Sequence, residues 1–265
     1  MSNTINEYWG REGLEQSILD ALGAAGKDLD ALDIDDLAPL DQYHGGGKGS
    51  TLRLARLAGL TPGMRVLDVG GGLGGPARTL AAEFGCHVTV LDVTEPYVEA
   101  GRALTQRLGL DPLVDHKLGD ALELPWDGSG FDAVWTQNGG MNIAAKERLY
   151  TGFHRALRPG GLLVLQEPLA GPVQPPIFPV MWATNPGDSF LRSPAEMLAL
   201  IVARGFRVRE WQDITDVVAA GRSAPSHHSI AYLIMGDRLD TISLNGKRND
   251  DEQRIVHVQA VFDRV

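Results

Sequence analysis

The turn at residues 70–75, which contains five glycines, constrains the fold of this 265-residue chain more than any other feature. An apolar strand pattern precedes it at residues 65–69, and a helical pattern follows at residues 76–84. Short glycine clusters between periodic segments mark tight turns and backbone that a ligand can approach closely. A buried strand, a glycine turn and a helix together predict the first unit of an α/β domain.

The same alternation continues along the chain. Strand patterns recur at residues 87–91, 114–118, 131–135, 162–165, 206–211 and 254–262, and helical patterns at residues 98–108, 146–157 and 194–203. Strands separated by helices of this length predict a parallel sheet. We therefore expect a Rossmann-like, seven-stranded, mostly parallel sheet with helices on both faces. In such sheets ligands bind beyond the carboxyl ends of the strands.

Four segments organise the predicted domain. Residues 1–60 are mostly helical in pattern and are expected to form an N-terminal helical lid, with the core at residues 61–265. An insertion at residues 168–190 is rich in proline and aromatic side chains, and a connection of this length is usually functional. Residues 213–253 are expected to form a second, C-terminal lid-like segment, although residues 219–244 carry no readable pattern.

Composition excludes several classes of partner. The chain has 24 Lys and Arg against 34 Asp and Glu, a net charge of −10, which disfavours nucleic acid and anionic membranes. The single cysteine, Cys86, cannot form an intramolecular disulfide, and its apolar surroundings predict a small buried side chain. No signal peptide or membrane-spanning run is present, so we expect a cytoplasmic protein that binds a small molecule. Homo-oligomerisation stays open.

The glycine turn predicts a nucleotide-like cofactor. Gly70, Gly72 and Gly75 fit the pattern G-x-G-x-x-G, and Asp92 follows Gly72 by 20 residues, where an acid can bind ribose hydroxyls. Asp68 discriminates between cofactors, because a carboxylate repels a pyrophosphate but attracts the ammonium and sulfonium of S-adenosylmethionine. The alternative is that Asp68 only caps the end of its strand.

Four motifs carry a family resemblance. Residues 66–77 (VLDVGGGLGGPA) resemble motif I of the class I S-adenosylmethionine-dependent methyltransferases. Residues 119–121 resemble the Gly-Asp-Ala after the third strand of that family, residues 131–137 its fourth-strand motif, and residues 157–161 its Leu-Lys-Pro-Gly-Gly. Four motifs in the family's order imply its fold, its cofactor and its reaction type.

Within that family the chain is most similar to the branch of the ubiquinone/menaquinone-biosynthesis and sarcosine/dimethylglycine methyltransferases. Residues 41–46 and 135–137, with 141–143, carry this likeness, whereas Gly71 departs from it and the last third matches only loosely. The resemblance implies these cofactor-binding residues: Tyr43, Asp68, Gly70, Gly72, Asp92, Val93, Asp120, Ala121 and Gln137. It leaves the acceptor open, including whether its N, O or C atom is methylated.

The acceptor side offers two catalytic candidates. His44 lies in a segment that folds over the cofactor in related enzymes, and Glu167 follows the fifth strand. Each has a structural alternative, since His44 with Tyr43 could stabilise a helix start near residues 50–51 and Glu167 could cap a turn. The expected substrate pocket comprises Tyr8, Asn138, Met141, Asn142, Phe178 and Trp182. Its aromatic rings favour an apolar or cationic acceptor.

No metal is expected. The adjacent pair His227-His228 has side chains that point apart in regular structure, and no partners stand at ligand spacing. The sequence therefore predicts a small-molecule methyltransferase. Two alternatives remain: a protein that binds S-adenosylmethionine without transferring methyl, and an NAD(P)-dependent oxidoreductase, which Asp68 opposes.

Overall fold

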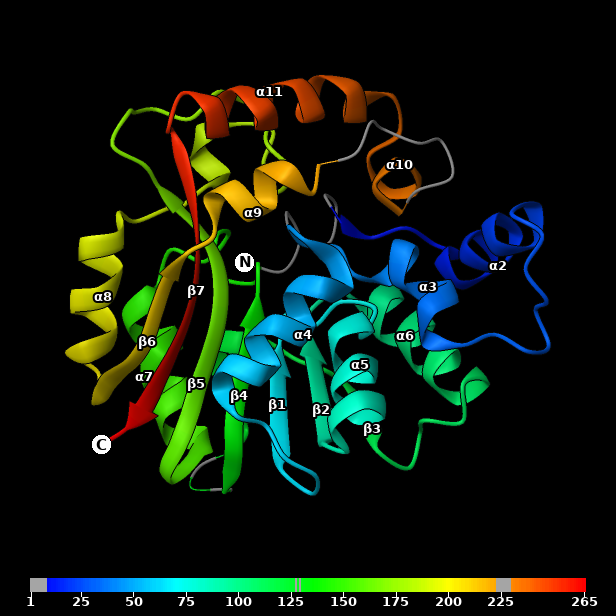
Figure 1. The fold of residues 1–265 in the computed structure, drawn as a ribbon, viewed down its shortest axis with the longest axis horizontal. Helices are drawn as coiled ribbons and strands as arrows, with labels where there is room; N and C mark the ends of the chain where they lie inside the picture. Colours follow the sequence, from blue (N-terminus) through cyan, green and yellow to red (C-terminus); the bar gives the residue numbers. More distant parts are fainter. Residues whose placement is uncertain (1–8, 127, 129, 223–229) are drawn as a thin grey trace.

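A seven-stranded sheet forms the centre of the protein in the computed structural model, which describes residues 9–126, 128, 130–222 and 230–265 (Figure 1). Its strand order is β3-β2-β1-β4-β5-β7-β6. β7 runs antiparallel to both of its neighbours, and the other adjacent strands are parallel. The predicted fold class is confirmed. The strands are β1 (Arg65–Val69), β2 (His87–Asp92), β3 (Val114–Leu118), β4 (Phe131–Gln137), β5 (Leu157–Ala170), β6 (Phe206–Asp213) and β7 (Ile255–Arg264).

Two apolar layers fix the sheet between its helices. On one face α4 (Gly47–Ala58) and α5 (Gly75–Phe84) pack on one layer, and on the other face α7 (Lys146–Ala156) and α8 (Pro194–Val202) pack on the second. Successive residues of a strand alternate between the layers, as Val66 and Leu67 do in β1. α6 (Glu95–Arg107) packs against β2 and β3.

The N-terminal helices are tied to the core beside the glycine turn. The region expected to be helical contains α2 (Leu14–Ala24) and α3 (Ile34–Asp41), and α3 is a short helix with an internal proline. Asp33 starts α3 through a capping box. At its other end the buried Asp41 Oδ2 accepts a hydrogen bond from Arg78 Nη2 of α5 at 2.8 Å.

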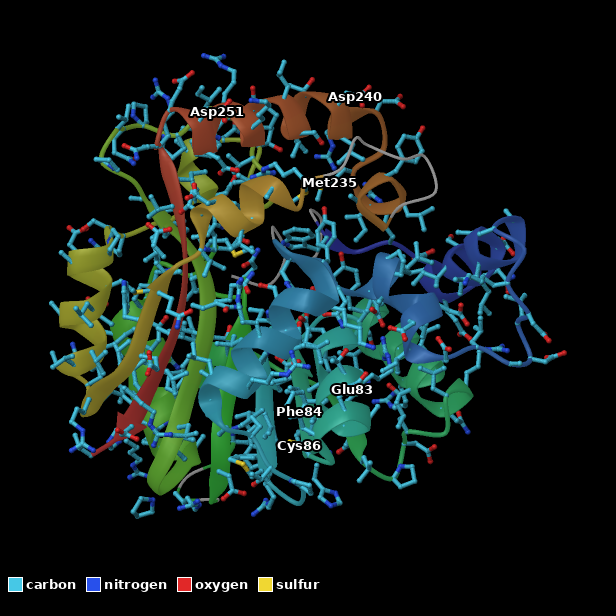
Figure 2. All side chains as sticks on the ribbon, viewed as in Figure 1. Glu83, Phe84, Cys86, Met235, Asp240 and Asp251 are labelled. Atoms are coloured by element: carbon cyan, nitrogen blue, oxygen red, sulfur yellow. The ribbon has the colours of Figure 1, made fainter. Side chains whose placement is uncertain are left out.

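Three helices cover the carboxyl edge of the sheet: α9 (Thr215–Ala220), α10 (Ile230–Met235) and α11 (Leu239–Asp251). Asp240 and Asp251 of α11 lie at the opposite end of the molecule from Cys86, which is buried as expected (Figure 2). Short 3-10 turns occur at Ala121–Glu123, Pro186–Asp188 and Gly236–Arg238. Among the described residues no helix is both long and apolar enough to cross a membrane.

A pair of glycine substitutions tests how closely α3 packs on α5. A Cβ at Gly75 would lie 2.3 Å from the backbone oxygen of Asp41, so Gly75→Ala forces backbone apart. We expect it to lower the free energy of unfolding by about 1–3 kcal/mol, the range for overpacking. In Gly49→Ala, a helical position with nothing within 4 Å, we expect a gain of about 0.5–1 kcal/mol. Urea unfolding measures both, and equal stabilities would contradict the packing described.

Candidate functional site

The glycine turn brings the backbone of residues 70–75 close to the ends of β1 and β2. Gly70, Gly72 and Gly74 have positive φ angles of 72°, 55° and 77°, which favour glycine. At Gly71 the reason is space, because a Cβ would lie 2.6 Å from Asp68 Oδ2. The turn thus brings the partly exposed residues 70–72 next to a buried carboxyl group.

Asp68 is an ionisable side chain in an unusually buried position. It is 1% exposed, and among the described residues its Oδ2 atom has no hydrogen-bond partner. Burial, and then the nearby Asp92 carboxylate, raise the pKa of Asp68 to about 8. An unpaired buried carboxyl group is costly, so this position fits a ligand that brings a positive charge.

Two further carboxylates follow the neighbouring strands. Asp92 at the end of β2 accepts hydrogen bonds from the N–H groups of Gly72 and Thr94, both at 2.9 Å. Burial raises its pKa, and these backbone bonds oppose the rise. After β3, Asp120 Oδ1 accepts from Leu122 N–H at 2.8 Å. Carboxylate oxygens have further lone pairs, so both side chains keep the capacity to accept hydrogen bonds from a ligand.

One cavity, here called the first cavity, joins these groups at the carboxyl edge of the sheet. All the residues expected to bind the cofactor line it: Tyr43, Asp68, Gly70, Gly72, Asp92, Val93, Asp120, Ala121 and Gln137. Sequence reasoning missed other lining residues, among them Asp41, Thr94, Tyr97 and Ile234. Thr94 and Tyr97 could have been found from the sequence, because they lie two and five residues after Asp92. Ile234 comes from a distant segment that no local pattern connects to the glycine turn.

A second cavity adjoins the first and shares Tyr43, His44, Asn138 and Met141 with it. Asn138 directly follows β4 and has a positive φ of 54°, a strained conformation for a residue other than glycine. Its backbone N–H bonds to the Gln166 carbonyl at 2.8 Å, and its buried Oδ1 has no partner among the described residues. A strained residue with an unsatisfied buried amide oxygen, within the described part of the chain, therefore lies at the junction of the two cavities.

The other expected pocket residues are distributed differently. Asn142 lines only the first cavity and Trp182 only the second. Phe178 lines neither, because it packs in an apolar cluster with Val180 and Trp182. Tyr8 and the pair His227-His228 lie outside the described residues.

His44 lies at the junction, but its hydrogen bonds favour a positioning role. Its Nε2 atom is 3.0 Å from Gln42 Oε1 and 3.1 Å from Thr51 Oγ1, and Thr51 belongs to α4. Burial lowers the pKa of His44 to about 4, so at neutral pH the ring is uncharged and only weakly basic. These contacts support the alternative that His44 stabilises the start of α4.

Glu167 lines neither cavity. It lies on the face of the sheet that α7 covers, where its Oε1 atom accepts a hydrogen bond from Gly140 N–H at 2.8 Å. Burial raises the pKa of Glu167 to about 7 despite the opposing charge of Lys146, and burial lowers the pKa of Lys146 to about 8. Lys146 also donates to the Gly140 carbonyl, so the pair fixes the loop after β4.

Comparison with known proteins shows which proteins this chain is similar to. Residues 66–161 match the model of a methyltransferase domain. The chain is 35% identical over 118 residues to a glycine/sarcosine/dimethylglycine N-methyltransferase of Actinopolyspora halophila, covering 44% of this chain and 21% of that protein. It is 36% identical over 114 residues to a sterol 24-C-methyltransferase of Gibberella zeae, covering 43% and 30%. The matched stretch thus spans less than a third of either relative.

Solved structures show the same fold over almost the whole chain. A geranyl diphosphate C-methyltransferase from Streptomyces coelicolor A3(2), in complex with Mg²⁺, geranyl-S-thiolodiphosphate and S-adenosyl-L-homocysteine, has a TM-score of 0.72 and 18% identity, covering 100% of this chain and 98% of that one. The [4+2]-cyclase SpnF has a TM-score of 0.68 and 20% identity, covering 95% and 93%. Residues 66–161 thus match a methyltransferase domain, and the resemblance to the S-adenosylmethionine-dependent methyltransferases is confirmed.

Burial of the ionisable Asp68 side chain is expected to lower the stability of the ligand-free protein at neutral pH. Because its pKa is raised in the folded state, its favourable contribution is complete below about pH 4 and is lost as the pH rises towards 8. We expect Asp68→Asn to stabilise the ligand-free protein at pH 7.5 by about 1–3 kcal/mol and to flatten this part of the pH dependence. Chemical unfolding across pH 4–8 measures both effects.

The matched control is Asp115→Asn, which changes an exposed carboxylate paired with Lys117 on β3. A surface pair of this kind contributes little, so this variant is expected to unfold like the wild type within about 0.5 kcal/mol. A loss of stability in Asp68→Asn at pH 7.5 would show that the Asp68 carboxylate is compensated in the free protein.

Proposed function

We propose that this protein is an S-adenosylmethionine-dependent methyltransferase that acts on a small-molecule acceptor. The observation that carries the proposal is Asp68, a buried carboxyl group beside the glycine turn whose Oδ2 atom has no partner among the described residues. An ammonium or sulfonium group supplies the missing positive charge, whereas a pyrophosphate would add to the negative charge. The family match over residues 66–161 supports the same cofactor.

The roles that we propose follow the order of the strands. Asp68 binds the ammonium group of the amino-acid end, and Asp92 accepts from the ribose hydroxyls with the lone pairs that Gly72 and Thr94 leave free. Asp120 binds the adenine amino group beside Ala121. Val93, Gln137 and Tyr43 complete the contacts around the first cavity.

When bound, S-adenosylmethionine supplies an already activated methyl group. The chain's own residues then have to hold the acceptor in line and exclude water. We place the acceptor in the second cavity, with its reacting atom near Asn138 and Met141 at the junction. Trp9, Met181 and Trp182 line this cavity and favour an apolar acceptor, and aromatic faces also attract cations.

We further propose that three segments close over the two cavities: the part of the expected N-terminal lid that precedes α4, the insertion at 168–190 and residues 213–253. The rest of the expected lid, α4, packs on the sheet and belongs to the core. Support comes from their place at the cavity walls, where Tyr43, Trp182 and Val218 meet the second cavity. Closure would shield a reactive sulfonium from water. We propose a small molecule as the partner and a cytoplasmic location, and the acidic balance of the chain disfavours nucleic acid as a partner.

A second candidate function has its own support. The cyclase SpnF matches 95% of this chain, so the same fold occurs in a protein whose name describes another reaction. A protein that binds S-adenosylmethionine without methyl transfer would have the same first cavity. Only transfer of radiolabelled methyl from the cofactor to an added small molecule separates the two.

Calorimetry tests the cofactor assignment. Wild-type protein is expected to bind S-adenosylmethionine and not NADH. Asp92→Ala should weaken binding by about 1.5–3 kcal/mol, the range for hydrogen bonds to a charged group, or roughly 10- to 150-fold in Kd. Asp115→Ala on the next strand is the control and should bind like the wild type. Unchanged affinity in a folded Asp92→Ala variant, or tight binding of NADH, would exclude the assignment.

Turnover tests the reaction itself. In wild-type protein supplied with radiolabelled S-adenosylmethionine and a panel of small apolar phenols, amines and carbon nucleophiles, we expect label in an organic product. Gly72→Val should bind no cofactor and transfer none, because a β-branched side chain is disfavoured at φ 55° and projects into the first cavity. Cofactor binding without transfer to any member of the panel would favour the second candidate.

A further inference from the structure

The second cavity contains a buried pair of ionisable side chains that the proposed function does not use. Asp250 near the end of α11 and His257 near the start of β7 are 7% and 5% exposed, and both line the cavity. His257 Nε2 lies 3.4 Å from Asp250 Oδ1. Neither ring nitrogen forms a hydrogen bond of good geometry within the described part of the chain.

Arg222, which follows α9, completes the cluster. Its Nε atom donates to Asp250 Oδ2 at 2.7 Å, so one oxygen of Asp250 is held by Arg222 and the other faces His257. Burial opposes ionisation of Asp250, but hydrogen bonding to His257 and Arg222 outweighs it and lowers the pKa of Asp250. Asp250 is therefore an anion that can stabilise a protonated His257.

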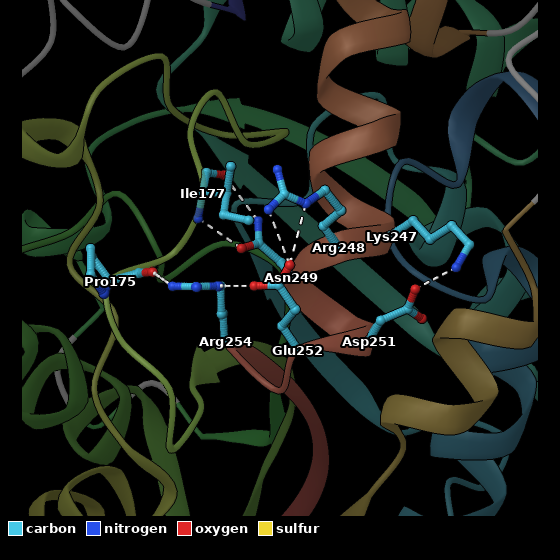
Figure 3. Close-up of polar contacts among 8 residues, drawn as sticks. All are labelled: Pro175, Ile177, Lys247, Arg248, Asn249, Asp251, Glu252 and Arg254. Carbon is cyan, nitrogen blue, oxygen red and sulfur yellow. Dashed lines mark hydrogen bonds and ion pairs between the residues drawn. The ribbon is translucent and has the colours of Figure 1, made fainter.

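The end of α11 is fixed in place, which gives the pair a defined position (Figure 3). Asn249 Nδ2 donates to the Ile177 carbonyl at 3.0 Å, and Ile177 N–H donates back to Asn249 Oδ1 at 2.7 Å. Arg254 Nη1 donates to the Pro175 carbonyl at 2.6 Å. The insertion at residues 168–190 thus holds the helix whose Asp250 faces His257.

His257 lies at the same edge of the sheet as the cavity junction. It is paired in register with Pro168 of β5, two residues beyond Gln166, whose carbonyl binds Asn138. β5 separates β4 from β7, so two strand spacings of about 4.8 Å lie between their backbones. The backbones of the two strands that carry Asn138 and His257 are therefore about 10 Å apart, and both residues line the second cavity.

We propose that His257 and Asp250 form a subsite of the second cavity that binds an acidic hydroxyl group of the acceptor and takes up its proton. The inference rests on the proposed function only in calling the occupant an acceptor. Asp250 favours the tautomer with hydrogen on Nε2, which leaves a lone pair on Nδ1. The acceptor's O–H bond breaks, the proton bonds to Nδ1, and the electron pair stays on oxygen.

The charge of the subsite favours an acceptor with a hydroxyl group over an amine. With His257 protonated, the cluster of His257, Asp250 and Arg222 has a net charge of +1, which stabilises the oxyanion and repels a cation. The other charged side chains lining this cavity are Lys247, Asp251 and Asp240 of α11, and Lys247 is paired with Asp251. The negative charge of Asp240 lies at the other end of α11, ten residues or about 15 Å along the helix from Asp250, so the local charge at His257 stays positive. The acceptor class is therefore a small, mostly apolar molecule with an ionisable hydroxyl, such as a phenol.

The probe is 4-nitrophenol, whose phenolate absorbs visible light and whose protonated form does not. At a pH where the free probe is mostly protonated, wild-type protein without cofactor is expected to raise the phenolate absorbance on binding. His257→Gln should remove this signal and weaken binding about tenfold, and Asp250→Asn should reduce the signal. The matched control is His87→Gln, an exposed histidine at the opposite edge of the sheet, which should behave like the wild type.

A second comparison does not depend on any variant folding. 4-Nitrotoluene, which lacks the hydroxyl group, should bind wild-type protein about tenfold more weakly than 4-nitrophenol. Equal binding of the two probes, no phenolate signal in wild type, or the full signal in folded His257→Gln would each overturn the subsite. S-adenosylmethionine calorimetry on the same preparations reports on the proposed function separately, because Asp250 and His257 lie outside the first cavity.

Discussion

The unpaired carboxyl group of Asp68 is the constraint on which the rest of the site depends. The parallel sheet carries it to the end of β1, and the glycine turn closes over it so tightly that Gly71 has no room for a side chain. Its raised pKa means that the free protein bears an energetic cost at this point. A cationic ligand removes that cost. The buried Asp68 carboxyl group therefore lowers the stability of the ligand-free protein and at the same time favours a cationic cofactor.

Sequence patterns could predict this part of the molecule because the information is local. The strands, the glycine turn and the acids at residues 68, 92 and 120 all follow from period, spacing and charge, and they line the first cavity as expected. The bounds of α3 could not be predicted in the same way, because eight residues with an internal proline show too little periodicity. Its capping box, Asp33 with Asp36, was the available signal.

The acceptor side depends on contacts between distant segments, which no local pattern encodes. The pair Asp250 and His257 arises because α11 folds back over the antiparallel strand β7 and is held by residues 175–177. Conversely, His44 and Glu167 were chosen from their positions after a glycine segment and a strand. Their roles depend on burial and on neighbouring residues. His44 contacts Thr51 of α4, and Glu167 accepts a hydrogen bond from Gly140 in the loop after β4.

The most direct test of this account is the number of protons released when S-adenosylmethionine binds, measured by calorimetry at pH 7 in buffers of different ionisation enthalpy. In the free protein the pKa of Asp68 is about 8, so its carboxyl group is largely protonated at pH 7 and ionises when a cation binds beside it. The account predicts that wild-type protein releases about one proton more per ligand than Asp68→Asn. The same proton count in both proteins would contradict it.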